Sequence, residues 1–203
     1  MDYDGETLIN HKVLRVRPGL RRFLREVQDL AHVIVRSSMV LENTEPIVAF
    51  LFRGLSPPCL ILGQESCNEL LDEKGRLVPK IGGGGGQQFL KVLNSNLWVP
   101  VPTLHGVPHG WWPTPLNTLL VDDSPAKSVL NPPGTVIFPI PWKGDMKDTF
   151  LENELAPYIR RLVTHAANFP NFVLSNPIGV RPLSPRSDVH KALVKFARLN
   201  KLI

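Results

Sequence analysis

The chain has 203 residues, of which 43% are hydrophobic, and its formal net charge is +5. This length suits one domain with an apolar core, and no apolar run approaches the roughly 20 residues that a membrane-spanning helix needs. The polar start, MDYDGETLINHK, does not resemble a secretory signal, and two cysteines without metal-type spacing, Cys59 and Cys67, indicate a reduced, intracellular protein.

Helical and extended patterns alternate along the chain. Apolar side chains such as Leu20, Leu24 and Val27 recur at the spacing of one helix face. On this basis helices are predicted at residues 17–31, 43–52, 87–98 and 148–166. Short apolar runs predict buried strands at residues 32–35, 58–63, 117–121 and 135–139. This order predicts an α/β domain with a mainly parallel sheet, which binds ligands at the carboxyl ends of its strands.

Two loop-rich stretches match ligand-binding motifs only in part. The glycine run at residues 82–86 is followed by Gln87 and Gln88, not by the lysine and hydroxyl residue of a phosphate-binding loop. It therefore predicts a flexible linker. His105 and His109 have the spacing of metal ligands on a helix, but the surrounding prolines prevent that helix. We therefore expect no metal at these histidines.

The C-terminal segment, residues 181–203, carries the positive charge of the chain. Six lysines and arginines face one aspartate there, a net charge of +5, so the remaining residues balance to zero. Val189 and Leu193 follow helical spacing. Ser187 or Asp188 is suited to cap the start of the helix. The segment is predicted to be a basic amphipathic helix, which either contacts an anionic partner or forms a docked or frayed solvated tail.

Two pairs of aspartates are candidates for a metal site. Asp122 and Asp123 follow a predicted strand directly, and Asp2 and Asp4 have the spacing D-x-D. Residues two apart on an extended segment point the same way. Adjacent carboxylates repel each other unless a cation or hydrogen bonds compensate, and carboxylate oxygens suit Mg²⁺. An aspartate pair at a strand end also occurs as a helix cap or turn, and that interpretation stays open.

Three further residues complete a set suited to phosphoryl transfer. Ser37 and Ser38 follow a predicted strand and are candidates for binding phosphate oxygens. Lys91, inside the predicted helix at residues 87–98, supplies a cation. In such a set one aspartate attacks phosphorus, a second handles the proton, and Mg²⁺ and lysine neutralise the developing charge.

The order of these motifs resembles that of the haloacid-dehalogenase superfamily. More narrowly, the chain is similar to the FCP/NLI-interacting-factor-like protein phosphatases, the group that contains the carboxy-terminal-domain phosphatases of RNA polymerase II. The segments FPNFVLSNPIG and NPPGTVIFP resemble an uncharacterised branch from plants and fungi. The resemblance covers about residues 2–180, and its segments are VRPGLRRFL, VIVRSS, EPIVAFL, FLKVL, NTLLVDDSPAKSVLNPPGTVIFP and LENELAPYIRRL.

The resemblance implies a three-layer, Rossmann-like α/β sandwich at residues 2–180, followed by the basic tail. It also implies a Mg²⁺-dependent phosphatase for serine and threonine phosphates in proteins. Asp2 is then the nucleophile and Asp4 the general acid and base. Ser37 and Ser38 bind the phosphate, and Lys91 stabilises the aspartyl-phosphate. Magnesium is held by a set of four residues: Asp2, Asp4, Asp122 and Asp123.

The chain departs from the family pattern at its start. Glu6 stands where the family motif has threonine, with Thr7 one position later, and its negative charge opposes phosphate binding. Only Met1 precedes Asp2, so we expect the first, central strand of the sheet to be missing or truncated. Both departures predict impaired catalysis.

Three functions are therefore compared. The first is the phosphatase, acting on a phosphorylated protein in the nucleus or cytoplasm. The second is a catalytically inactive interaction or scaffold protein of the same fold, similar to the receptor subunit of the mitochondrial inner-membrane translocase. The third is a binding protein with a basic tail, in which the acidic pairs have only a structural role.

Overall fold

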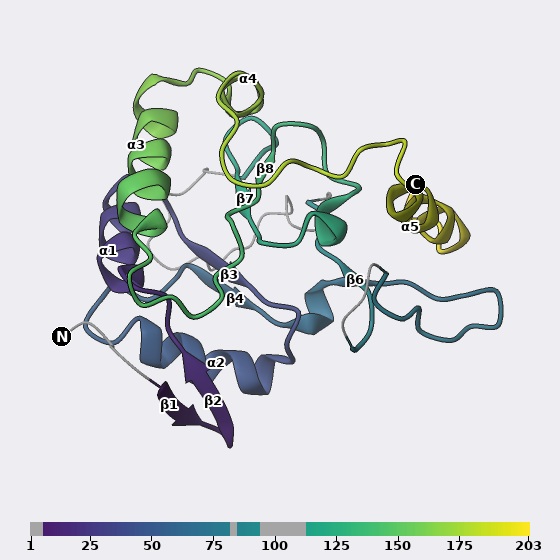
Figure 1. Ribbon diagram of the computed structural model, residues 1–203, viewed down its shortest axis with the longest axis horizontal. Helices are drawn as coiled ribbons and strands as arrows, with labels where there is room; N and C mark the ends of the chain where they lie inside the picture. Colours follow the sequence, from purple (N-terminus) through teal and green to yellow (C-terminus); the bar gives the residue numbers. More distant parts are fainter. Residues whose placement is uncertain (1–5, 82–84, 94–112) are drawn as a thin grey trace. The chain divides into compact units, whose positions relative to one another are not determined.

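The computed structural model describes residues 6–81, 85–93 and 113–203 (Figure 1). The chain divides into two compact units. The described residues of the first unit are 6–65 and 141–167, and those of the second unit are 66–81, 85–93, 113–140 and 168–203. Both units therefore combine segments that are distant in the sequence.

The first unit contains a parallel strand–helix–strand motif. Strands β3 (Ile34–Arg36) and β4 (Leu60–Leu62) pair in parallel along their whole length. The connection between them is α2 (Leu41–Leu51), the kind of crossover that parallel strands require. Val48 and Phe52 are 4% and 7% exposed, so this helix and the residue that follows it supply the centre of the apolar core.

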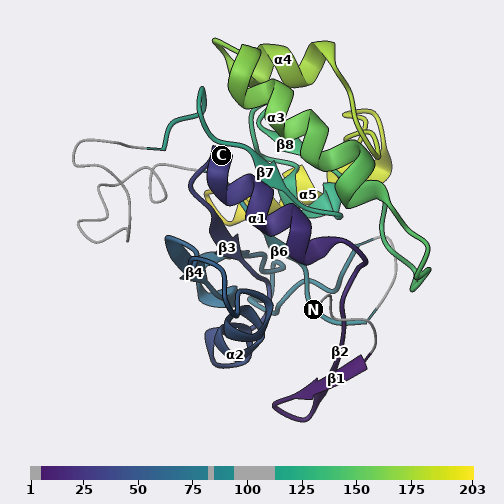
Figure 2. The same ribbon diagram turned by 90° about the vertical axis from the view of Figure 1, so that its left-hand side faces the viewer.

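Two helices of the first unit, α1 (Leu20–Leu30) and α3 (Ala156–His165), pack against each other. Helix α1 begins after Gly19, whose φ of 74° turns the chain into the helix. Leu24 and Val27 are buried at helical spacing, as their positions in the sequence predict. Helix α3 (Ala156–His165) packs beside α1 (Figure 2).

An ion pair joins the segments that lead into these helices. A π-helical turn, η3 (Leu151–Leu155), runs directly into α3. Just before it, Asp148 accepts two hydrogen bonds of 2.8 Å from the Arg17 guanidinium. These bonds hold the pKa of Asp148 below its ordinary value. The same guanidinium lies 4.9 Å from the centre of the Phe150 ring, so the cation is held by charge and by an aromatic face.

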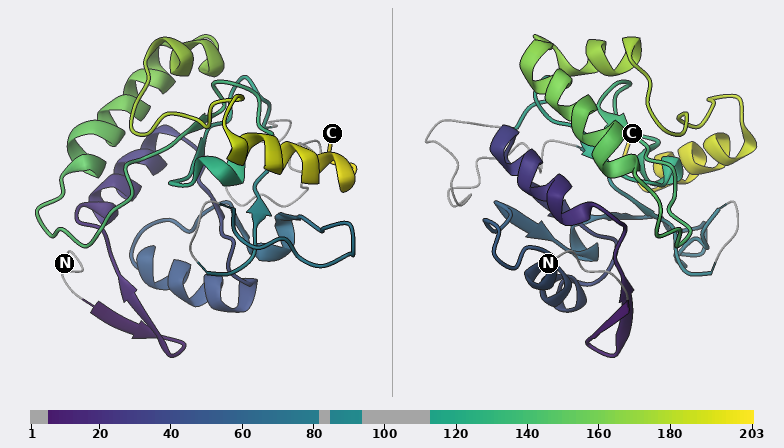
Figure 3. Two further views of the ribbon diagram at one scale, coloured as in Figure 1. Left: turned by 45° about the vertical axis from the view of Figure 1, so that its right-hand side comes forward. Right: turned by 60° about the vertical axis from the view of Figure 1, so that its left-hand side comes forward.

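A hairpin precedes α1 (Figure 3). Strands β1 (Glu6–Ile9) and β2 (Lys12–Arg15) pair in antiparallel fashion. The two turn residues, Asn10 and His11, have φ values of 47° and 59°. Positive φ at both central positions is typical of two-residue hairpin turns. The sequence analysis did not predict this hairpin.

The second unit has one antiparallel and one parallel strand pair. β5 pairs antiparallel with β6, and β7 pairs in parallel with β8. The 3₁₀ turn η1 precedes β5, and the 3₁₀ turn η2 follows β7. The bounds are η1 (Gln64–Ser66), β5 (Asn68–Glu69), β6 (Phe89–Leu90), β7 (Leu120–Val121), η2 (Pro125–Ser128) and β8 (Val136–Ile137).

The basic C-terminal segment forms a helix that belongs to the core of the second unit. Helix α5 (Asp188–Leu199) begins after Ser187, whose side chain accepts a hydrogen bond from the His190 amide, as expected of a cap. Leu193 and Ala197 are fully buried. Leu193 packs in one cluster with other buried apolar residues of the unit, namely Leu70, Val78 and Leu90.

Polar contacts also hold this segment. The Asn200 side chain accepts a hydrogen bond of 3.1 Å from the Leu71 amide and donates one of 2.9 Å to the Leu71 carbonyl. Lys195 Nζ lies 3.2 Å from Glu73 Oε1 at the surface. Asn200 therefore satisfies both backbone groups of Leu71 and fixes the end of α5 against the second unit.

Most of the predicted elements are confirmed. Helices overlap the predicted ranges 17–31, 43–52, 148–166 and 181–203, although α2 begins two residues before its predicted range, and strands overlap all four predicted strand ranges. The mixed α/β class with parallel strand pairs is also confirmed. The described strands form four two-stranded sheets, and the single larger sheet stays a prediction. No helix in the described ranges is long and apolar enough to cross a membrane.

The predicted helix at residues 87–98 is wrong where the structure describes it. Residues 87–93 contain strand β6 and extended chain, and residues 94–98 lie outside the described residues. Phe89 and Leu90 are 7% and 0% exposed, so consecutive side chains are buried. This is typical of a strand covered on both faces, and a short apolar run does not distinguish it from a buried helix. Most of the glycine run and both His105 and His109 also lie outside the described residues.

A close approach of two backbones in the second unit requires glycine at position 134. Gly134 has a φ of 82°, and an added Cβ would lie 2.4 Å from the Pro170 carbonyl oxygen in α4 (Phe169–Ser175). Gly75 has a similar φ of 72° but has no atom within 4 Å of such a Cβ. Alanine at position 75 would therefore be destabilised by its backbone conformation alone, whereas alanine at position 134 would also clash with Pro170.

We predict that Gly134→Ala lowers the free energy of unfolding by more than Gly75→Ala does. Each substitution places an alanine in the left-handed conformation, which costs about 1–2 kcal/mol for a residue with a Cβ. Only Gly134→Ala also forces the chain away from Pro170. Urea denaturation of both variants measures the difference, and equal losses would contradict the importance of this contact.

Candidate active site

Asp122 is placed by the parallel pair of the second unit. It directly follows β7, and its backbone amide donates a hydrogen bond of 3.2 Å to the Ile137 carbonyl of β8. Two residues earlier, the Leu120 amide donates to the Thr135 carbonyl at 2.9 Å. Asp122 therefore stands at the carboxyl end of a parallel strand, the position where α/β sheets present ligand-binding groups.

The partner of Asp122 is Lys91. Lys91 Nζ lies 2.6 Å from Asp122 Oδ2, and both residues are only 7% exposed. The sequence analysis assigned Lys91 to a helix, and this assignment is wrong because the residue directly follows strand β6. The two charges neutralise each other in a region with little water, where a single unpaired charge would be costly.

The backbone around Lys91 is held by a second layer of contacts. The Lys91 amide donates a 2.6 Å hydrogen bond to the Lys127 carbonyl in η2. The Asn131 side chain donates to the Lys91 carbonyl at 2.8 Å and accepts from the Leu93 amide at 2.6 Å. Asn131 and the turn at Lys127 therefore fix the segment from which the lysine reaches Asp122.

The sequence analysis did not identify Asn131. The signal in the sequence is its place before two prolines, in NPPG, because asparagine favours turns through hydrogen bonds from its side chain to backbone groups. Asn131 and Lys91 are 40 residues apart, so their contact produces no periodic pattern in the sequence. The sequence predicted Lys91 and Asp122 as members of one phosphoryl-transfer set, but not that their side chains contact each other.

The two adjacent aspartates have different environments. Asp122 is buried, and its Oδ1 accepts a hydrogen bond of 2.8 Å from the Ser124 amide. Asp123 is exposed to solvent. This arrangement separates the two carboxylates, because one is neutralised inside the unit and the other is hydrated. The repulsion expected between adjacent negative charges is thereby reduced.

Asp122 and Asp123 are the two predicted magnesium ligands that the structure describes. Both Asp122 oxygens already interact, one with Lys91 and the other with the Ser124 amide. Mg²⁺ requires about six oxygen ligands in a regular octahedron. No group of three acidic, histidine or cysteine side chains suited to a metal occurs among the residues that the structure describes. The other two predicted ligands, Asp2 and Asp4, lie outside those residues.

The predicted phosphate-binding serines belong to the first unit. Ser37 follows β3, where its amide donates to the Leu62 carbonyl at 2.8 Å and its Oγ accepts from the Met39 amide at 3.0 Å. Ser38 lies next in the bend and is half-buried. Both serines therefore stand at the carboxyl end of a parallel strand, as predicted. Of the predicted site residues described, the structure brings Lys91 and Asp122 into contact.

No protein-family model matches the chain, and no curated protein matches its sequence. The relation to the haloacid-dehalogenase phosphatases therefore stays a prediction that rests on the motifs and their order.

The described cluster offers a buried cation and a polar turn. The Lys91 ammonium has three hydrogen-bond donors and donates to Asp122. A buried ammonium group fixed by a carboxylate is suited to stabilise negative charge without a large rearrangement. It is equally suited to tie two chain segments together, so its effect on stability is measurable apart from any activity.

We predict that Lys91→Met is strongly destabilising. It leaves Asp122 as an uncompensated buried charge, which typically costs about 3–5 kcal/mol. The double variant Lys91→Met/Asp122→Asn should lose less, because asparagine is neutral and retains an oxygen for the Ser124 amide.

Chemical denaturation of the two single variants and the double variant measures this coupling. Asp123→Asn is the matched control, and we expect it to change stability by less than about 0.5 kcal/mol because Asp123 is exposed. Additive losses for positions 91 and 122 would contradict the interaction.

Proposed function

We propose that the chain is a phosphoprotein phosphatase of the haloacid-dehalogenase type with a three-layer α/β fold. The observation that carries this proposal is the buried contact between Lys91 and Asp122 at the carboxyl end of β7. A phosphatase of this type needs a fixed cation next to an acidic strand end. The sequence placed both residues in one candidate set, Lys91 as the cation beside the phosphate and Asp122 as a magnesium ligand. The two parallel strand pairs support the proposed fold.

The proposed chemistry begins with Asp2. Its carboxylate attacks phosphorus, an aspartyl-phosphate forms, and the bond to the serine or threonine oxygen of the substrate breaks. Asp4 donates a proton to that leaving oxygen and then takes one from the water that hydrolyses the intermediate. Lys91 neutralises negative charge on the phosphoryl group, and Asp122 holds the lysine in place. Ser37 and Ser38 are proposed to bind phosphate oxygens.

Magnesium belongs to this proposal through the predicted ligands Asp2, Asp4, Asp122 and Asp123. When bound, the ion would supply positive charge next to the phosphate. The structure describes two of these ligands, Asp122 and Asp123, whereas Asp2 and Asp4 lie outside the described residues. The substrate class is a phosphorylated protein, and a nuclear or cytoplasmic location is proposed with it.

A catalytically inactive interaction protein is the second candidate. It is favoured by the engagement of both Asp122 oxygens, one by Lys91 and one by the Ser124 amide. A pair that is already neutral and hydrogen-bonded is what a structural role requires. In this case the fold would present a surface to a partner, and the aspartates would have no role in turnover.

We predict slow Mg²⁺-dependent hydrolysis of p-nitrophenyl phosphate and of a phosphoserine peptide by the full chain, because the charge of Glu6 opposes phosphate binding, and we predict the loss of this hydrolysis in Asp2→Asn. The substitution removes the charge of the nucleophile and changes little else. Asp29→Asn is the matched control, because Asp29 is an exposed aspartate of α1. Initial rates at increasing Mg²⁺ concentration measure the effect.

The outcomes separate the candidates. Turnover that Asp2→Asn abolishes and Asp29→Asn leaves unchanged supports the phosphatase. Turnover that survives Asp2→Asn contradicts the role of Asp2. A folded wild-type chain without turnover at any Mg²⁺ concentration contradicts the phosphatase and favours the interaction protein.

A further inference from the structure

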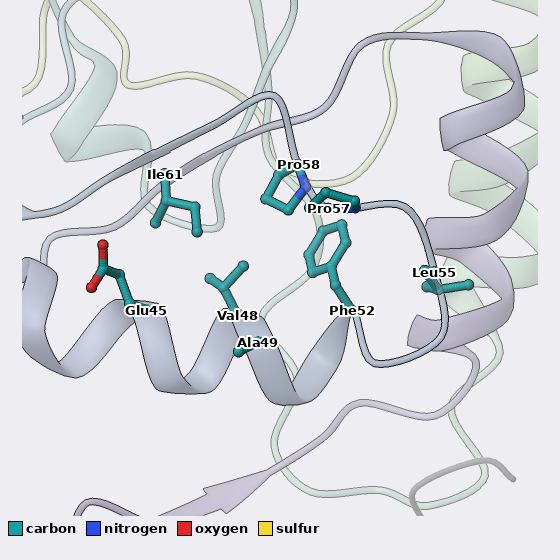
Figure 4. A pocket seen from close by; sticks show the side chains of 8 residues that line it. All are labelled: Glu45, Val48, Ala49, Phe52, Leu55, Pro57, Pro58 and Ile61. Atoms are coloured by element: carbon teal, nitrogen blue, oxygen red, sulfur yellow. The ribbon is translucent and has the colours of Figure 1, made fainter. Parts of the chain in front are cut away.

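A cavity of about 340 Å³ lies in the first unit between α2 and the segment that leads into β4 (Figure 4). Four residues of α2 and its end line one side: Glu45, Val48, Ala49 and Phe52. Their spacing of three, four and seven residues places them on one helix face. Val48 and Phe52 are buried, whereas Glu45 and Ala49 are exposed. The helix therefore supplies both the apolar floor and part of the rim.

The opposite side of the cavity is formed by the chain between α2 and β4. It includes Leu55, Pro57, Pro58 and Ile61 (Figure 4). Pro58 is buried and Pro57 is exposed. Prolines have a fixed φ and no backbone amide, so this wall is stiff and offers no amide donors at the two positions. The cavity is thus apolar on both sides and already formed.

One charge faces this apolar space. Glu45 is the only ionisable residue that lines the described cavity. Within the described part of the chain, its carboxylate makes no ion pair or hydrogen bond. Figure 4 shows the carboxylate at one end of the cavity and the Phe52 ring toward the other. A complementary ligand therefore has an apolar body and a positive charge at one end.

We propose that this cavity docks a peptide segment that carries a large apolar side chain close to a lysine or arginine. The apolar side chain would enter between α2 and the two prolines, and the cation would pair with Glu45. The volume is at the lower end of the range of ligand pockets, about 300–1,000 Å³, which suits one large side chain with its neighbours. The site is in the first unit and is independent of the proposed phosphatase residues Lys91 and Asp122.

The charge of Glu45 and the apolar floor of the cavity indicate which occupant fits. An acidic or neutral segment would leave the Glu45 carboxylate without a partner at an apolar rim. Apolar anchors in preformed pockets supply most of the affinity of such complexes, and a charge at the rim contributes more to selectivity. The proposal therefore predicts modest affinity with a clear preference for positive charge.

The test uses capped eight-residue peptides of glycine and serine. The first carries one tryptophan and, two positions later, one lysine; the second has glutamate in place of the lysine; the third has alanine in place of the tryptophan. Two-dimensional NMR titrations of the full chain should show shifts confined to residues 45–61 with the first peptide. The second should bind about fivefold to tenfold more weakly, in keeping with an exposed ion pair and a like-charge penalty, and the third should not bind measurably.

Two variants and a control locate the site. Glu45→Lys should reverse the preference between the lysine and glutamate peptides. Ala49→Trp, at an exposed helix position, should fill the mouth and abolish binding of both. Glu42→Lys makes the same charge change on α2 outside the cavity and should leave the affinities within about twofold, because exposed charges interact weakly through solvent.

Other occupants give different outcomes, and each would overturn the proposal. Equal affinity for the first two peptides, or no change in Glu45→Lys, would rule out recognition of a cation. A dimer in light scattering that Ala49→Trp dissociates would identify a second copy of the chain as the occupant. Binding of hexylamine at the same residues without binding of the first peptide would identify a small cationic ligand instead.

Discussion

The buried ion pair between Lys91 and Asp122 is the constraint around which the second unit is arranged. Two opposite charges 2.6 Å apart and almost fully buried must remain together, because separating them would leave each buried charge uncompensated. The two residues directly follow strands β6 and β7 and are 31 positions apart in the chain. Asn131 and the turn at Lys127 hold the lysine segment, and the β7–β8 pair holds the aspartate. The packing of α5 against Leu70 and Leu90 closes the core beneath these contacts.

The ion pair between Lys91 and Asp122 is compatible with both proposed functions, the phosphatase and the inactive interaction protein. A fixed ammonium group at the end of a parallel strand is what a phosphoryl-transfer site needs, and a neutralised pair is also what a structural module retains. The difference between them depends on Asp2 and Asp4 and not on Lys91. The cavity beside α2 raises a separate question, since its apolar walls and single carboxylate belong to the first unit and suit recognition of a partner.

The elements that the sequence predicted best are helices with a long, regular pattern of apolar residues. Helices α1, α3 and α5 bury residues such as Leu24, Leu162 and Leu193 at helical spacing, and each was predicted in place. The short strand at Phe89 was predicted as helix because two consecutive buried side chains carry no period that distinguishes the two structures. The bonds of Asn131 to residues near 91 join distant positions through side-chain and backbone groups, so composition and periodicity do not reveal them. The apolar cavity depends on the path of the Pro57–Pro58 segment over α2, which only the fold determines.

Native-state hydrogen exchange tests most directly whether the ion pair holds β6 to the turn after β7. The backbone amides to follow are those of residue 91, bonded to the Lys127 carbonyl, and of Ser124, bonded to Asp122. The Phe23 amide in α1, bonded to the Gly19 carbonyl, is the reference in the first unit. In Lys91→Met, the account predicts that both amides of the second unit exchange at least about tenfold faster, a loss of about 1.4 kcal/mol in opening free energy, while Phe23 is unchanged. Unaltered protection of residue 91 and Ser124 in a folded Lys91→Met protein would contradict it.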